Sequence, residues 1–285
     1  MNFGVSVFPT AAIIRPDDLA KDVENRGFAS LWFPEHSHIP TSRATPWGGR
    51  EGAPPLPKYY AETFDQFVAL TAAAASTTTL RLGAGISLVA QRDPIWLAKQ
   101  VASIDVLSGG RFEFGIGYGW NKEEMAQHGV RYGDRRALLR EKVLMMKELW
   151  TAEVAVFKGE LLELEPTWAW PKPLQRPHPP ISLGSAGGPR TFADIIEFCD
   201  TWMPIPSRTD LATKVAELRK QSEASGRDPD SIGLGVFGAR PKDEFIDLLR
   251  ELGFETVIFS LRQDEPEAVN TSLDEYTAFI QRHRD

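Results

Sequence analysis

Cysteine is almost absent from this chain of 285 residues, in which Cys199 is the single example. One thiol excludes an internal disulfide and any cysteine-rich zinc or iron–sulfur site, and it fits a reducing compartment. Cys199 stands between Phe198 and Asp200 at the end of an expected helix, where a thiol packs as a small apolar group. We therefore expect Cys199 to belong to the core rather than to act as a nucleophile.

Long apolar runs and blocks of positive charge are absent as well. No window approaches the ~20 apolar residues of a membrane-spanning helix, and the N-terminus MNFGVSVFPT lacks the basic region of a signal peptide. The formal net charge is −7, with lysine and arginine spread along the chain, so neither nucleic acid nor a membrane is an expected partner. These features predict a cytoplasmic protein that acts on a small-molecule substrate.

What the chain does contain is an alternation of short apolar runs with longer segments of helical period. Eight runs are expected strands: residues 2–8, 30–33, 80–86, 111–116, 180–183, 201–205, 232–237 and 256–261. Eight segments are expected helices: residues 16–26, 64–75, 94–107, 135–149, 190–198, 211–224, 241–252 and 268–282. Several of these begin at proline and end at glycine, which are start and stop signals of helices.

Eight strands that alternate with eight helices match the size of a closed (β/α)8 TIM barrel, typically ~250 residues. The competing fold is an open, doubly wound sheet, which needs a glycine fingerprint at its first βα turn. That turn reads FPTAAIIRP and contains no glycine. We therefore predict one α/β barrel domain, residues 1–285, with its active site at the carboxyl ends of the strands.

Two segments interrupt the alternation. Residues 37–62 are rich in proline and glycine, which predicts a long, lid-like loop after the second strand. Residues 157–180 precede the fifth strand as an insertion, and their sequence suggests a β-hairpin followed by an extended, proline-rich crossing.

The most conspicuous polar motif is LWFPEHSHIP, residues 31–40, at the end of the second expected strand. His36 and His38 lie two positions apart, so on extended chain they point to the same side, as half of a metal site does. The alternatives are a single catalytic histidine beside Glu35, or a polar turn. No later strand end supplies further ligands, because the other histidines lie elsewhere: His128, His178 and His283. We therefore predict no metal and retain His36 as the reactive residue.

Glycines mark the ends of the next two strands. Gly83 and Gly85 alternate with larger residues in LGAGISLVAQRDP, which either narrows the strand for core packing or lets a flat ligand lie against the backbone. In FEFGIGYGWNKEE, Gly117 and Gly119 precede Trp120 and Asn121, which offer a stacking surface and an amide. The first motif leaves both explanations open, and the second favours a ligand.

The segment PISLGSAGGPRTFADIIEF favours a phosphate site. A strand ends at Gly184, and a helix opens at Pro189. Free backbone N–H groups and the helix dipole at such an N-terminus attract anions. The residues that form this cradle are Gly184, Ser185, Ala186, Gly187, Gly188, Pro189 and Arg190. A tight βα turn is the alternative explanation.

The motifs GFASLWFPEHSHIP, LAKQVASIDVLSGGRFEFGIGYGW and PHPPISLGSAGGPRTFADIIEF together resemble the luciferase-like flavin and deazaflavin oxidoreductases. The resemblance covers most of residues 1–205, and it is strongest to the actinobacterial branch that uses coenzyme F420. It implies that Glu35 and His36 serve catalysis, with His36 facing the deazaflavin ring. It also implies a cis peptide bond at Gly85–Ile86, next to Ala84, that supports the ring, and a homodimer.

The same resemblance assigns the remaining pocket. It implies that Gly117, Gly119, Trp120 and Asn121 line the ring and ribityl chain, and that residues 184–190 hold the phosphate. Glucose-6-phosphate dehydrogenases of the family carry a glutamate acid at the position of Trp120, so sugar phosphate oxidation is not expected. A more apolar substrate pocket is expected instead, from Trp120 and from three residues of the long loop: His38, Trp47 and Tyr59 or its neighbour Tyr60.

The sequence therefore predicts hydride transfer between F420 and an organic substrate, with His36 exchanging the accompanying proton. The nearer alternative is an FMN-dependent monooxygenase that relies on a partner reductase. A second alternative, from another class, is a cofactor-binding protein without turnover.

Overall fold

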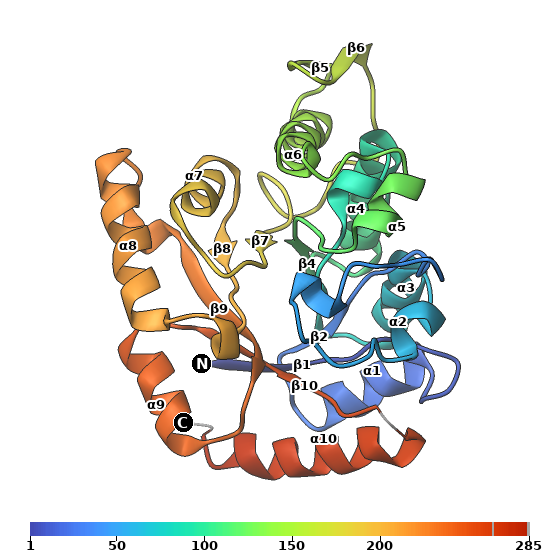
Figure 1. Ribbon diagram of the computed structural model, residues 1–285, viewed down its shortest axis with the longest axis vertical. Coiled ribbons are helices and arrows are strands. Elements are labelled where there is room, and N and C mark those ends of the chain that lie inside the picture. Colours follow the sequence, from blue (N-terminus) through green and yellow to red (C-terminus); the bar gives the residue numbers. More distant parts are fainter. Residues whose placement is uncertain (264, 284–285) are drawn as a thin grey trace.

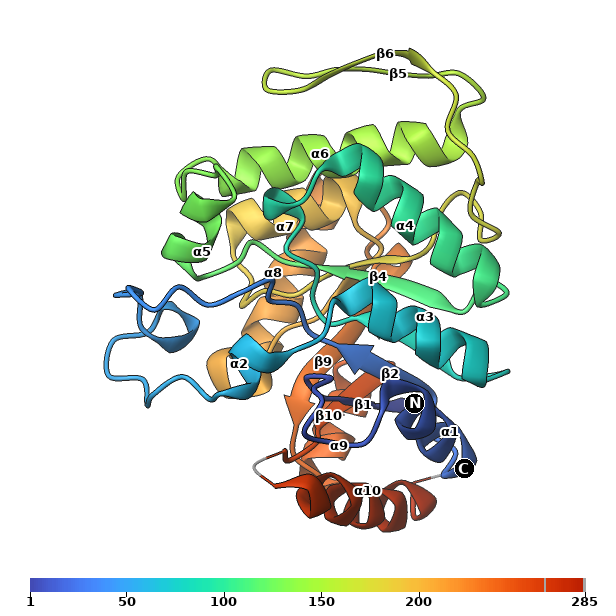
Figure 2. The ribbon, with the colours of Figure 1, turned by 90° about the vertical axis from the view of Figure 1, so that its right-hand side faces the viewer.

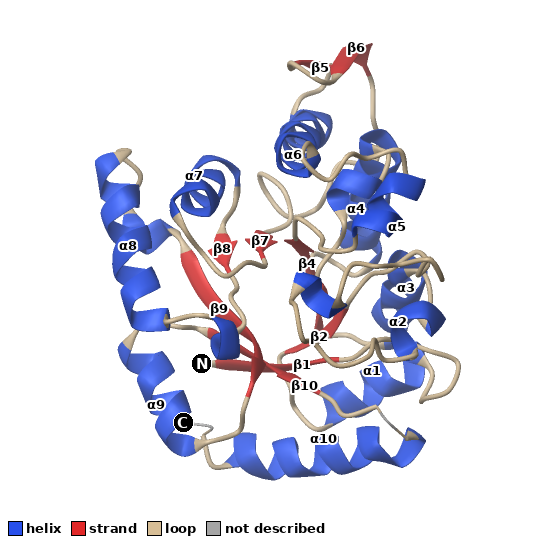
Figure 3. Ribbon diagram, viewed as in Figure 1, coloured by secondary structure: helices blue, strands red, loops and turns tan. Residues whose placement is uncertain are grey.

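The computed structural model describes residues 1–263 and 265–283 of the chain. Within them, parallel strands close into a barrel in the order β1-β10-β9-β8-β7-β4-β3-β2, with all helices outside it (Figures 1 and 3). The predicted (β/α)8 barrel is confirmed, and every barrel strand falls within or overlaps a predicted run. The strands are β1 Asn2–Ser6, β2 Ser30–Phe33, β3 Arg81–Ala84, β4 Phe112–Ile116, β7 Ile181–Leu183, β8 Thr201–Trp202, β9 Gly233–Ala239 and β10 Thr256–Ser260.

The helices form because their apolar residues recur on one face and their ends carry caps. Aspartate side chains accept the first free N–H groups of three of them: Asp65 from Val68 N at 2.9 Å, Asp93 from Trp96 N at 2.8 Å, and Asp210 from Thr213 N at 3.2 Å. The helices are α1 Pro16–Asn25, α2 Tyr59–Glu62, α3 Gln66–Ser76, α4 Pro94–Leu107, α5 Lys122–Gln127, α6 Arg135–Thr151, α7 Pro189–Phe198, α8 Leu211–Ala224, α9 Asp243–Glu251 and α10 Pro266–Gln281. None of the helices in the described ranges is long and apolar enough to cross a membrane.

The interior of the barrel is filled by large side chains that glycines admit. Trp32 is fully buried and packs with Met203, Ile258 and Phe237. A Cβ on Gly83 would lie 2.1 Å from the Trp32 ring. Gly83 therefore serves the packing of the barrel, which is the plainer of the two explanations for the alternating glycines of β3.

The two predicted interruptions are present in the structure. The long segment after β2 contains a short 3₁₀ turn, Trp47–Gly49, and ends in α2. Before β7, strands β5 Ala155–Lys158 and β6 Glu163–Thr167 pair as an antiparallel hairpin, which confirms the predicted hairpin. Figure 2 shows this hairpin beyond α6, at one end of the molecule and away from the barrel.

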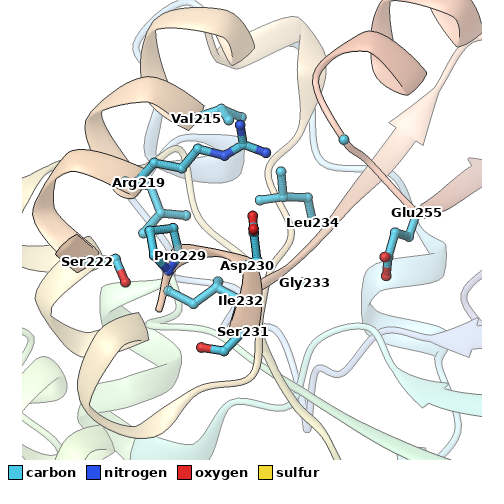
Figure 4. Close-up of a pocket in the computed structure, with 12 residues that line it drawn as sticks. Val215, Arg219, Ser222, Pro229, Asp230, Ser231, Ile232, Gly233, Leu234 and Glu255 are labelled. Carbon is cyan, nitrogen blue, oxygen red and sulfur yellow. The ribbon is translucent and has the colours of Figure 1, made fainter. Parts of the chain in front are cut away.

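A cavity of about 500 Å³ lies at the amino ends of β9 and β10, beside α8. Figure 4 shows its walls, which include Arg219 of α8, the turn around Asp230, and Glu255 just before β10. Enzymes of this fold place their active sites at the carboxyl ends of the strands. This cavity lies on the opposite face of the barrel. We assign it no part in the reaction.

Candidate active site

A second cavity, of about 510 Å³, opens at the carboxyl ends of the strands, and every barrel strand contributes to its wall through its last residues or the segment after it. That convergence is what the barrel topology predicts for an active site. The lining residues are Ser6, Val7, Phe8, Pro34, Glu35, His36, Trp47, Gly48, Tyr59, Tyr60, Gly85, Ile86, Leu88, Gly117, Tyr118, Gly119, Trp120, Gly184, Ser185, Ala186, Met203, Ile205, Arg208, Phe237, Gly238, Ser260, Leu261 and Gln263. We call this cavity the carboxyl-end pocket.

One wall of the pocket is bare backbone arranged around Ile86. The peptide bond between Gly85 and Ile86 is cis, as the resemblance implies. A Cβ on Gly117 would lie 2.6 Å from Ile86 Cδ1, and one on Gly184 would lie 2.9 Å from Ile86 Cγ2. Side chains at Gly117 and Gly184 would therefore collide with Ile86, so the two glycines make room for the Ile86 side chain in this wall. Ala84, just before the cis bond, is buried at the end of β3.

His36 lies in the pocket wall and is only 7% exposed. Its Nδ1 atom lies 2.7 Å from Oε2 of Glu124, a fully buried residue of α5. Burial alone would raise the pKa of Glu124, but hydrogen bonds and the charge of His36 bring that pKa below its ordinary value. The carboxylate at His36 is therefore ionised at neutral pH. Glu124 is not among the site residues predicted from the sequence, although it is the last residue of the motif FEFGIGYGWNKEE.

Glu35 also lines the pocket, but it holds the neighbouring loop. Its Oε1 atom accepts a hydrogen bond from Arg92 at 2.5 Å, and its Oε2 atom accepts one from Leu88 N at 2.6 Å. Arg92 in turn packs over the ring of Phe67. These bonds connect the end of β2 to the segment after β3. The carboxylate that bonds to His36 is therefore that of Glu124, not that of Glu35. A catalytic role for Glu35 stays a prediction.

His36 and His38 diverge, although they lie two positions apart. His38 Nδ1 lies 2.8 Å from Ser37 Oγ, and its Nε2 lies 2.5 Å from Gln127 Oε1. Its ring is also 5.5 Å from that of His128. The described residues contain no group of three histidine, cysteine or acidic side chains that could hold a metal ion.

Aromatic rings cover the part of the pocket around His36. The ring centroid of Tyr60 lies 5.1 Å from that of His36, and the rings of Phe8 and Trp120 lie at 6.3 and 5.7 Å. Trp47, on the long loop, packs edge-on against Tyr60 at 5.8 Å. The predicted substrate residues Trp47 and Tyr59 therefore stand in the pocket wall, whereas the predicted His38 contacts α5.

The turn between β7 and α7 forms the opposite end of the pocket. Gly184, Ser185 and Ala186 line the cavity directly. The predicted residues beyond them complete the turn and open the helix: Gly187 and Gly188, which have positive φ angles, then Pro189 and Arg190. No side chain caps α7, and within the described residues the buried Ser185 Oγ has no hydrogen-bond partner.

The loop after β4 is fastened to α7 by a polar cluster. Tyr118 donates to Asp194, and Arg136 donates to the hydroxyl of Tyr118 and to Asp194, both at 2.9 Å. Next along the loop, Asn121 caps α5, and within the described part of the chain its buried Nδ2 atom has no acceptor. This arrangement holds the backbone of Gly117 beside the turn at Gly184.

These features fit a flat ring joined to a phosphate. The wall around Ile86 consists of glycine backbone and one aliphatic side chain, a surface against which a flat ring can pack. The uncapped N-terminus of α7 and the unpartnered Ser185 hydroxyl offer hydrogen-bond donors to an anion. Ile86 and Ser185 line one cavity, so a single ligand can reach both.

Comparison with known proteins gives relatives of two cofactor types. The uncharacterized protein Rv0953c of Mycobacterium tuberculosis is 37% identical over 99% of this chain and 97% of its own length. An F420-dependent hydroxymycolic acid dehydrogenase of the same organism is 25% identical over 81% of this chain and 60% of its length. An FMNH2-dependent dimethylsulfone monooxygenase of Pseudomonas putida is 29% identical over 69% of this chain and 53% of its length.

Solved structures share the fold over the whole chain. The monooxygenase RslO1 from Streptomyces bottropensis superposes with a TM-score of 0.79 at 19% identity, covering 99% of both chains. An F420-dependent secondary alcohol dehydrogenase in complex with an F420-acetone adduct gives 0.75 at 17% identity, covering 100% of both chains. The sequence profile described as luciferase-like monooxygenase matches residues 1–240. The chain therefore belongs to the luciferase-like monooxygenase family, which includes F420-dependent and FMN-dependent enzymes.

Proposed function

We propose that the protein is an oxidoreductase that transfers a hydride between coenzyme F420 and a fairly apolar organic substrate. The observation that carries this proposal is the pair of His36 and buried Glu124 at the end of a pocket with a bare glycine wall. Hydride transfer to or from a carbon that bears oxygen needs a partner for the accompanying proton. A histidine fixed by a carboxylate is such a partner.

The residues that would hold the cofactor lie on two walls. The backbone of Gly85, Ile86 and Gly117 would support the ring, and the turn at Gly184 with the hydroxyl of Ser185 would bind the phosphate. When bound, F420 supplies hydride transfer at its deazaflavin ring. The protein supplies position, the exclusion of water and the proton.

Glu124 determines which nitrogen of His36 is available for that proton. The ionised carboxylate accepts a hydrogen bond from Nδ1–H, so Nε2 carries the free lone pair. Since His36 lines the pocket, Nε2 is the atom that can take a proton from a substrate hydroxyl or, once protonated, return it to a carbonyl oxygen. Glu124 stabilises the imidazolium that this transfer creates.

The aromatic rings around His36 favour an apolar substrate. Phe8, Tyr60 and Trp120 all lie within 6.3 Å of the His36 ring, centroid to centroid, and Trp47 closes against Tyr60. Such rings bind apolar groups and exclude water from the reacting atoms. We infer a substrate whose reacting carbon carries apolar substituents.

The second candidate is an FMN-dependent monooxygenase, which the similarity to the dimethylsulfone monooxygenase supports. The two functions differ in their need for oxygen. The test mixes the protein with F420 under strictly anaerobic conditions and follows the absorbance of the oxidised deazaflavin across a panel of apolar secondary alcohols. The proposal expects bleaching without oxygen. If no alcohol bleaches F420, while reduced FMN supports oxygen-dependent product formation, the second candidate replaces the first.

A further inference from the structure

We propose that Glu124, Ser37 and His128 form a relay that carries protons between His36 and the solvent behind the carboxyl-end pocket. We call these three residues the Ser37 relay. The inference deepens the proposed function, since it depends on His36 exchanging a proton in each turnover. It assigns roles to three residues that neither the metal interpretation nor the cofactor interpretation of the sequence used.

The contacts of the relay are continuous. Glu124 bonds His36 Nδ1 through Oε2 and bonds Ser37 through Oε1, at 3.1 Å to the backbone N and 3.4 Å to Oγ. Ser37 Oγ in turn lies 2.7 Å from Nε2 of His128. Glu124 is fully buried, whereas Ser37 and His128 are exposed, so the contacts run from the pocket wall to the surface.

Protons need a route to solvent on the Nδ1 side of His36, because its pocket side is closed to water during turnover. His36 is 7% exposed, and the rings of Phe8, Tyr60 and Trp120 surround its pocket side. A cofactor and an apolar substrate would displace the remaining water from that side. The Nδ1 side, which faces Glu124, then provides the connection with solvent.

The charges around His128 favour its role as the acceptor at the end of the relay. Partial burial lowers the pKa of His128, and the neighbouring His38 lowers it further. Arg92 and Lys142 act in the same direction, and Glu124 opposes them. His128 is therefore neutral near pH 7 and able to take a proton. Its ring is exposed, so it can pass that proton to water.

His38 branches from the same hydroxyl, but its second nitrogen is occupied. Ser37 Oγ lies 2.8 Å from His38 Nδ1, and His38 Nε2 lies 2.5 Å from the amide oxygen of Gln127. An amide does not accept and release protons at neutral pH. We therefore place the outlet at His128 rather than at His38.

Oxidation of an alcohol releases one hydride and one proton. The C–H bond breaks, and its electron pair leaves with the hydrogen as a hydride to the deazaflavin. The O–H proton passes to His36 Nε2 as the C=O bond forms. His36 then releases its Nδ1 proton to Oε2 of Glu124, and rotation of the protonated carboxyl group brings this hydrogen to Ser37. Ser37 Oγ takes it and gives its own hydroxyl hydrogen to His128 Nε2, which passes the charge on to water. His36 is left with hydrogen on Nε2, and it regains its Nδ1–H form by exchange with water after the product leaves. Carbonyl reduction runs the same transfers in reverse.

The test uses two variants that are nearly isosteric and differ in the hydroxyl. Ser37→Thr keeps the relay atom, whereas Ser37→Val removes it. The protein is loaded with F420 or FMN, whichever it binds, and labelled with 15N at histidine. The exchange of the His36 ring N–H with water is then measured by NMR. Because either cofactor would occupy the pocket beside His36, this measurement does not depend on which of the two binds.

The relay predicts that exchange is at least tenfold slower in Ser37→Val than in the natural protein, and that Ser37→Thr exchanges at close to the natural rate. His128→Gln should also slow the exchange, and Gln127→Ala should leave it within about twofold. In the cofactor-free proteins, whose pocket admits water, the exchange rate should differ little between the variants and the natural protein. Equal exchange rates in Ser37→Val and Ser37→Thr in the loaded protein would overturn the proposal.

Discussion

Nδ1 of His36 lies 2.7 Å from Oε2 of Glu124, although the two residues are 88 positions apart in the chain. The contact joins the end of β2 to α5, which follows β4, and it buries a carboxylate beside the histidine that lines the pocket. A buried acid costs free energy unless it is bonded. Its bonds to His36 and to Ser37 N compensate for that burial and orient the imidazole ring.

Replacement of His36 should abolish most of the turnover while leaving cofactor binding intact. In His36→Asn the amide can still accept or donate hydrogen bonds, but it cannot exchange a proton, so kcat should fall by about 10²–10⁴-fold. The F420 dissociation constant, measured by fluorescence, should change by less than about threefold. Normal kcat in this variant would remove His36 from the mechanism.

Replacement of Glu124 should affect the pH profile as well as the rate. Glu124→Gln keeps a hydrogen-bond acceptor near His36 but removes the charge that stabilises imidazolium, so kcat should fall by about 10–100-fold. Because the pKa of Glu124 is lowered in the folded protein, its contribution to stability is present above the unfolded pKa, 4.5, and is lost as pH falls through the folded pKa. The profile of kcat against pH checks the first effect, and urea unfolding at pH 7 and at pH 4 checks the second.

Filling the glycine wall should weaken cofactor binding. The new Cβ in Gly117→Ala would lie 2.6 Å from Ile86 Cδ1, so Ile86 must move toward the ring site. We expect at least a tenfold weaker F420 affinity, with partial recovery in the double variant that adds Ile86→Val, since valine lacks Cδ1. Gly133→Ala is the matched control, because no heavy atom lies within 4 Å of its new Cβ. Equal affinities for Gly117→Ala and Gly133→Ala would show that the wall does not contact the cofactor.

Glu24, which does not line the carboxyl-end pocket, should stabilise the folded protein to a degree that depends on pH. Its Oε1 accepts backbone N–H groups of Thr78, Thr79 and Leu80 at 2.9, 2.6 and 2.9 Å. Burial opposes ionisation, but these bonds bring the pKa of Glu24 from 4.5 to about 2. The stabilisation is therefore complete above pH 4.5 and is lost as pH falls toward 2.

The measurement for Glu24 is urea unfolding of Glu24→Ala against pH. At pH 7 the variant should be less stable by about 2 kcal/mol, because three backbone donors lose a charged acceptor. The difference between the two proteins should shrink as the pH approaches 2. A difference that stays constant over this range would contradict the assigned cause.

Replacement of the loop residue Trp47 should affect substrate binding more than the rate of the chemical step. Trp47 packs against Tyr60, whereas the bond that orients His36 comes from Glu124. Trp47→Ala should therefore raise KM for apolar substrates by about tenfold and change kcat by less than about threefold. A fall in kcat at unchanged KM would instead place Trp47 at the reacting atoms.

The fold could be predicted from the sequence because the signals for it are local. Apolar runs such as 30–33 and capped helices such as Pro94–Leu107 show their period within a few residues, and β2 and α4 have the predicted bounds. The role of the glycine motifs was harder to predict from the sequence, because it depends on contacts across the barrel. Gly83 admits Trp32, whereas Gly117 and Gly184 leave room for Ile86, and no local pattern separates the two uses.

The partner of His36 could not be predicted for the same reason. Glu35 is adjacent in sequence, but its carboxylate is bound to Arg92, whereas Glu124 reaches His36 only through the closure of the barrel. The signal that was available is the acidic first turn of α5, which follows the glycine loop after β4. The homodimer and the cytoplasmic location stay predictions.

The most direct test of the central claim is a parallel titration of the purified protein with F420 and with FMN, followed by fluorescence. If the protein uses F420, it should bind F420 with a submicromolar dissociation constant and FMN at least tenfold more weakly, and Gly117→Ala but not Gly133→Ala should lose F420 affinity. Submicromolar binding of FMN with no binding of F420 would show that the protein does not use F420.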